Sequence, residues 1–207
     1  PENRRPLTVS SVTGGFRIVF SNRLSIAYAF ATAVLSGATF GFANSSQQLF
    51  AEHFDMGVYF PIAYGIVAGA MSAAAFLNAR MVGKIGMRRM SHFAILCFIV
   101  LALGFLTFSL LGIASLNSTL FFIAAALFMH GWSASNMNSL AMEPLGKLAG
   151  TASSVFGFIQ TVGGATLGLI LGRLYDGTVT PLAWGYLFIG FGTLALALIA
   201  ENGRLFG

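Results

Sequence analysis

Charged side chains are scarce in this sequence. Only 8% of its 207 residues are Asp, Glu, Lys or Arg, whereas 57% are hydrophobic and the mean hydropathy is +0.82. A soluble domain carries about a quarter charged residues, which cover its surface. Because this polar coat is missing, we expect lipid in place of water around most of the chain. The composition therefore indicates an integral membrane protein.

Cysteine is almost absent, and so are catalytic motifs. The single cysteine, Cys97, excludes an internal disulfide and a cysteine metal cluster. The chain has no H-E-x-x-H motif, no G-x-S-x-G context and no phosphate-binding loop. His130 and Ser133 could pair, but they share one helical turn and no third residue orients the histidine. We therefore predict no enzyme activity, no cofactor and no metal site.

Long apolar runs, by contrast, are abundant. A helix needs about 20 mainly apolar residues to cross the hydrocarbon core of a bilayer. Residues 1–22 are more polar and are predicted to form a cytoplasmic linker that ends in a short interfacial helix at 16–22. Residues 23–207 are predicted to form one all-α bundle of six transmembrane helices, at 23–44, 57–80, 91–113, 118–141, 148–174 and 179–200.

Basic residues are distributed unequally between the two sides of these helices. Ten of the eleven fall on the side that holds both chain ends, and only Arg173 falls on the other. Because basic residues resist translocation, we expect this side to be cytoplasmic. The same placement explains the net charge of +5 without a nucleic-acid partner. The ten residues are Arg4, Arg5, Arg17, Arg23, Arg80, Lys84, Arg88, Arg89, Lys147 and Arg204.

A short internal similarity indicates a repeat. Ala79-Arg80-Met81 closes the second predicted helix, and Gly172-Arg173-Leu174 closes the fifth on the opposite side. Three helices followed by three inverted ones would place the two segments in this way. The match is short enough to arise by chance, so two explanations remain.

Hydroxyls follow one face of the first predicted helix. Thr32, Ser36 and Thr39 recur at steps of three and four, as residues on one helical face do. Such a stripe either lines a water-filled path or packs closely against a neighbouring helix, with each hydroxyl bonded back to its own backbone. We expect the first of these two arrangements.

The fourth predicted helix holds the densest group of polar residues, including His130, Ser133 and Asn136, and Gln160 lies near the centre of the fifth. Ionisable residues at this depth face a cavity or pair with another group. His130 could couple protons or contact a substrate, because histidine titrates near neutral pH. Alternatively, it is a neutral histidine bonded to a neighbouring helix.

Glycines recur at every fourth position in two helices. Small residues at this spacing let helix backbones approach closely in a membrane. We predict that they pack against a second bundle, although packing inside this bundle explains them equally well. The residues concerned are Gly65, Gly69, Gly164, Gly168 and Gly172.

Residues 79–89 (ARMVGKIGMRR) resemble the loop signature of the major facilitator superfamily. The signature's first glycine, its aspartate and one of its basic residues are replaced here. The predicted loop motif consists of Arg80, Lys84, Gly86 and Arg88, of which the last three match the signature.

Residues 142–154 (MEPLGKLAGTASS), with 77–80 (LNAR) and 176–178 (DGT), resemble the Bcr/CflA drug-resistance transporters. The resemblance covers the whole chain but only the C-terminal six helices of a twelve-helix protein. It implies proton-driven export of small amphiphilic drugs across the bacterial inner membrane, by alternating access with an N-terminal half or a second copy. It places substrate against Thr32, Ser36, Thr39, His130, Ser133, Asn136 and Gln160.

Two rival hypotheses remain open. The chain could be a membrane interaction module that binds a partner without transporting anything. It could also be a metabolite carrier of the same fold, which only substrate assays distinguish from a drug exporter.

Overall fold

The computed structural model describes residues 17–206, with the backbone alone at position 147. The predicted linker at residues 1–15 lies outside this range. Residues 17–21 form the short helix that the sequence predicts ahead of the bundle. Within the described range, six helices are long and apolar enough to cross a membrane. They are α2 (Arg23–Ser46), α3 (Phe60–Ile85), α4 (Met87–Leu110), α5 (Leu116–Met142), α6 (Ala149–Arg173) and α7 (Thr180–Ala200).

The predicted start of the third span was wrong by one turn. The sequence predicts this span at 91–113, but α4 already begins at Met87 and takes Arg88 and Arg89 into its first turn. The connection from α3 is Gly86 alone, which has φ of 92°. Glycine adopts this conformation without steric cost, so one residue suffices to turn the chain.

Three of the spans continue beyond their α-helical part. At the end of α2, residues Gln47–His53 form a π-helical segment, and Gly57–Tyr59 form a 3-10 turn before α3. After α5, residues Glu143–Leu148 form a 3-10 segment that leads into α6. Pro144 lies in its first turn, where its missing N–H breaks no hydrogen bond.

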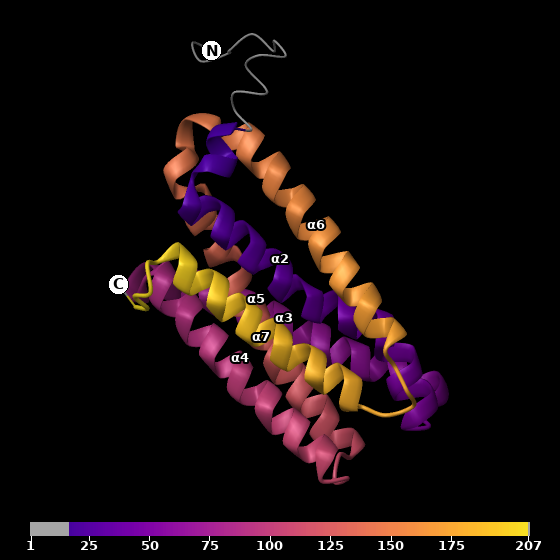
Figure 1. Ribbon diagram of the computed structural model, residues 1–207. Helices are drawn as coiled ribbons and strands as arrows, with labels where there is room; N and C mark the ends of the chain where they lie inside the picture. The colour runs from indigo at the N-terminus through magenta and orange to yellow at the C-terminus, as the bar shows by residue number, and fades with distance from the viewer. Residues whose placement is uncertain (1–16, 207) are drawn as a thin grey trace.

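The packing of the helices follows a pseudo-symmetric plan. Figure 1 shows α6 lying along α2 and α7 lying beside α4. Helix α2 packs against α6 and α7, and α5 packs in the same way against α3 and α4. Helices α2 and α5 begin at Arg23 and Leu116, and helices α4 and α7 begin at Met87 and Thr180. The separation in sequence is the same for both pairs. This arrangement is that of a three-plus-three inverted repeat.

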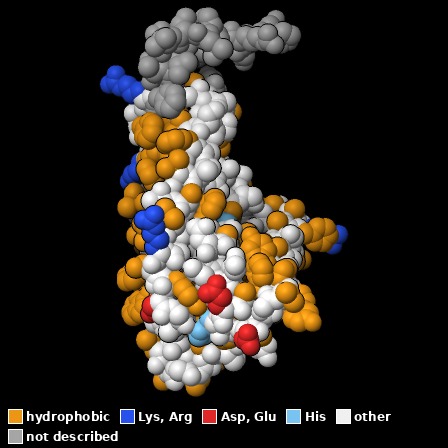
Figure 2. All heavy atoms as spheres, turned by 90° about the vertical axis from the view of Figure 1, so that its right-hand side faces the viewer, with side chains coloured by type: hydrophobic (Ala, Val, Ile, Leu, Met, Phe, Trp, Pro, Cys, Tyr) orange, Lys and Arg blue, Asp and Glu red, His pale blue; other side chains and the backbone are white. Residues whose placement is uncertain are grey.

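Burial is very uneven among the helices. In the most hydrophobic part of α2, 67% of the residues are buried, against 17% in α3 and 28% in α6. Helix α2 is therefore the centre of the bundle, while α3 and α6 keep most of their surface free. Figure 2 shows the consequence on one face, where hydrophobic side chains spread along most of the molecule and Asp and Glu side chains lie only in its lower part.

Candidate functional site

The contact between α2 and α5 contains a polar pair, in which His130 is buried and Thr39 is half-buried. The Thr39 hydroxyl oxygen lies 2.8 Å from Nδ1 of His130, whose side chain is only 7% exposed. Nε2 of His130 is buried and has no hydrogen-bond partner among the described residues. A buried polar nitrogen is costly unless it meets a partner. The ring therefore offers one unused hydrogen-bonding position in the interior of the bundle.

A second pair links α2 to α6. The amide Nε2 of Gln160 donates to the Ser36 hydroxyl at 3.2 Å. Ser36 is buried, whereas Gln160 is half-buried. Two of the predicted site residues on α2 thus contact different helices: Thr39 contacts α5 and Ser36 contacts α6.

A third polar contact joins α5 to α3 through a residue that the sequence prediction missed. Asn78 Nδ2 donates to Asn136 Oδ1 at 3.1 Å, and Asn136 Nδ2 donates back to Asn78 Oδ1 at 2.6 Å. Asn78 Nδ2 also lies 3.1 Å from the Ser135 hydroxyl. Both asparagines are buried. A lone asparagine in an apolar helix was the available signal, but only the fold shows that it meets Asn136.

The hydroxyl stripe of α2 does not line an open path within this bundle. The Thr32 hydroxyl donates to the Tyr28 carbonyl of the same helix at 2.8 Å. Thr32 is 2% exposed and Ser36 is 3% exposed. On α5, Ser133 donates back to the Met129 carbonyl at 3.1 Å and is fully buried. Close packing with bonds to the helix's own backbone therefore describes Thr32 and Ser133, in place of the expected cavity.

The side chains that do reach an open surface lie elsewhere. A pocket of about 470 Å³ opens between the end of α2 and the start of α3, lined by Ala43, Gln47 and Tyr64 among others. On α5, the Asn138 side chain is exposed, whereas the neighbouring Met137 is buried. Asn138 is a further polar residue of the fourth predicted helix that the sequence prediction did not include in the site.

The two glycine ladders have different surroundings, contrary to the prediction that both face a second bundle. A Cβ on Gly164 would lie 3.0 Å from Ser36 Cβ, and one on Gly172 would lie 3.0 Å from Asn44 Cβ. Gly168 lies directly against the backbone of α2. The ladder of α6 is thus used inside the bundle. Among the described residues, no atom outside the adjoining part of α3 lies within 4 Å of a Cβ added to Gly65 or Gly69.

Comparison with known proteins explains this architecture. Residues 1–168 match the family model described as Major Facilitator Superfamily. The chain belongs to the major facilitator superfamily. This is a family of membrane transporters and not of enzymes, and its fold accounts for the six spans found within the described residues.

One curated relative indicates which kind of superfamily member this chain resembles. The chain is 27% identical over 187 residues to the "Bicyclomycin resistance protein homolog" of Haemophilus influenzae. The match covers 87% of this chain but 46% of the relative, so the chain spans about half the length of that protein. No solved structure matches. The predicted similarity to a superfamily drug-resistance transporter is confirmed.

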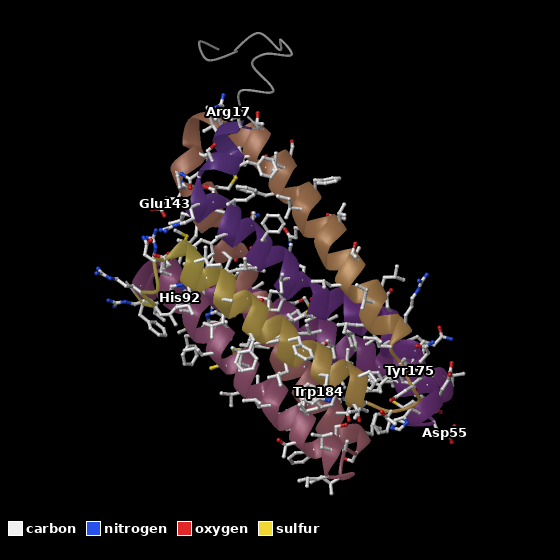
Figure 3. All side chains as sticks on the ribbon, viewed as in Figure 1. Arg17, Asp55, His92, Glu143, Tyr175 and Trp184 are labelled. Carbon is white, nitrogen blue, oxygen red and sulfur yellow. The ribbon has the colours of Figure 1, made fainter. Side chains whose placement is uncertain are left out.

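The superfamily loop motif divides into exposed and paired residues. Arg80 and Lys84 are exposed, and the Arg80 guanidinium lies over the Phe76 ring, 4.2 Å from its centroid. Arg88 instead forms ion pairs with two carboxylates, to Glu143 at 3.1 Å and to Glu201 at 2.8 Å. Figure 3 shows Glu143 and His92 at this end of the bundle, with Asp55 and Tyr175 at the opposite end.

Proposed function

We propose that this chain is the C-terminal half of a proton-coupled exporter of small amphiphilic molecules, and that it works by alternating access with a second six-helix half. The observation that carries the proposal is the Thr39–His130 pair, an ionisable group with a free nitrogen in the α2–α5 contact of a superfamily bundle. The name of the Haemophilus influenzae relative supports a drug-like substrate.

The second half would cover the free surface of α3. Gly65 and Gly69 leave room there for a close approach of another helix. The relative is about twice as long as this chain, which supports an N-terminal half as the partner in place of a second copy. Glycines of α6 are not required for this seam, since α2 already contacts them.

The proposed orientation places both chain ends in the bacterial cytoplasm. It rests on the basic residues of the described range, eight of which fall on one side of the six spans while Arg173 falls on the other. Arg80, Lys84, Arg88 and Arg89 all lie at the junction of α3 and α4 on that side, while Glu52, Asp55 and Asp176 lie at the opposite ends of the helices.

Thiol labelling would test where the water-filled path runs. In the complete transporter without Cys97, a cysteine at Asn138 or Ala43 should react with a membrane-impermeant thiol reagent, because both positions are exposed. Cysteines at Thr32 and Ser36 should stay at least about tenfold slower, because both are buried. Equal rates at all four positions would contradict the open surface described above.

Replacement of His130 tests the proton coupling. In the complete transporter, His130→Ala and His130→Gln should each reduce efflux driven by a pH gradient about tenfold or more, because neither side chain can take up and release a proton. Dye efflux from inverted vesicles measures this. Ser133→Ala is the matched control, since its hydroxyl bonds only to its own helix. Undiminished efflux in His130→Gln would assign His130 to packing.

A further inference from the structure

A second cluster of titratable side chains lies at the end of the bundle where α2 begins and α7 ends. Tyr28 and His92 are both fully buried there. Glu201 follows α7 directly, and its side chain is 13% exposed. None of these groups belongs to the proposed transport site. Together they connect α2, α4 and the segment 201–206, which lie far apart in the sequence.

The hydrogen bonds of this cluster run in one direction. The backbone N–H of Phe206 donates to His92 Nδ1 at 3.0 Å, so Nδ1 must be an acceptor. Tyr28 donates its hydroxyl hydrogen to Glu201 Oε1 at 2.8 Å. The 3.0 Å contact between the Tyr28 oxygen and His92 Nε2 is then a bond donated by Nε2–H. His92 is therefore neutral in this arrangement, with its hydrogen on Nε2.

The segment 201–206 depends on His92 for its position. It leaves α7 through a turn in which Gly203 N–H donates to the Leu198 carbonyl at 2.8 Å. The Phe206 ring meets the His92 ring edge-on, with centroids 5.7 Å apart. Phe206 also has φ of 64°, a conformation that is unfavourable for an aromatic residue. Its bond and ring contact with His92 offset that cost.

We propose that His92 is a proton-controlled docking site for the segment 201–206. A second proton on the ring would convert Nδ1 from acceptor to donor, so that it would oppose the Phe206 N–H. The bond would break, and the strained Phe206 would leave its site. The Nε2–Tyr28–Glu201 bonds can persist, because Nε2 stays a donor in both states. The structure thus assigns a releasable segment to one end of the transporter half.

The charged neighbours of His92 come from three elements. Arg88 lies on the same helix, Glu201 follows α7, and Glu143 starts the segment after α5. Arg88 already pairs with both carboxylates. These three groups carry one positive and two negative charges, a net charge of −1, and Nδ1 gains no acceptor from them.

Hydrogen exchange at the Phe206 amide tests the proposal, using the full chain in detergent micelles. The exchange rate is expressed as a protection factor, which corrects for the intrinsic effect of pH. Wild type should be protected at least about tenfold near pH 8 and lose that protection near pH 5. His92→Gln is the control, because glutamine can accept from Phe206 and donate to Tyr28 without titrating, and it should be protected equally at both pH values.

Three results would overturn the proposal. They are an unprotected amide in wild type near pH 8, equal protection of wild type at both pH values, and loss of protection on acidification in His92→Gln as well. The two wild-type measurements decide the matter by themselves if the variant cannot be purified. The readout involves no substrate, so it is independent of whether the complete protein exports drugs.

Discussion

Replacement of Gly168 by alanine should destabilise the bundle by about 1–3 kcal/mol, as overpacking of a close contact does. The added Cβ would clash with Phe40 Cβ and would lie 2.6 Å from the Phe40 carbonyl carbon and 2.9 Å from the Gly41 nitrogen. Backbone atoms cannot rotate aside, so α6 must move away from α2. Because α2 is nearly its sole partner among the described helices, α6 would lose most of its packing. Thermal unfolding in detergent measures the loss.

Gly157→Ala is the matched control on the same helix. In the described part of the chain, no atom outside the adjoining part of α6 lies within 4 Å of a Cβ added to Gly157, and alanine favours a helix over glycine by up to about 1 kcal/mol. The melting temperature should therefore stay the same or rise. A similar decrease in both variants would show that α6 does not use its glycines for contact with α2.

Replacement of Asn78 by alanine should cost about 1–3 kcal/mol, because it leaves the Asn136 amide buried without its partner. The double variant Asn78→Ala/Asn136→Ala should cost less than the sum of the two single changes, since no orphaned amide remains. Coupling energies between polar residues of membrane helices are about 0.6–1.7 kcal/mol, which sets the expected deviation from additivity. Unfolding of the three variants measures it.

Asn138→Ala is the control for these three variants. Asn138 lies on the same helix as Asn136, but its side chain is exposed, so its loss should change stability by less than about 0.5 kcal/mol. Strictly additive effects of the Asn78 and Asn136 changes would refute the reciprocal amide pair as a source of stability.

The number and approximate limits of the spanning helices could be predicted from the sequence because lipid imposes a minimum apolar length, and the chain shows that length six times within residues 17–206. The predicted limits of the helices were wrong between α3 and α4, where a single residue makes the turn. Arg88 looked like part of a loop but lies in the first turn of α4, where it pairs with Glu143 and Glu201, which are distant in sequence. An ion pair of this kind leaves no periodic signal.

The candidate site was predicted as a set of residue types but not as a set of contacts. The sequence identified His130, Thr39, Ser36, Gln160 and Asn136 as polar residues that need partners in a membrane. It could not show that they form three separate pairs, nor that Asn78 completes one of them. Helical periodicity gives the face of one helix, whereas the rotation and crossing of two helices decide which faces meet.

The glycines of α3 and α6 show this division most clearly. By itself the sequence determined that both helices have a face on which another helix can approach closely, because absent side chains permit this wherever they recur at helical spacing. Only the tertiary structure decided that α2 occupies the face of α6 while Gly65 and Gly69 of α3 stay open. The hydrophobic composition determined that lipid surrounds the chain, and the lengths of the apolar runs determined how many helices cross it. The packing of α2 against its neighbours determined which partner each polar or small residue has.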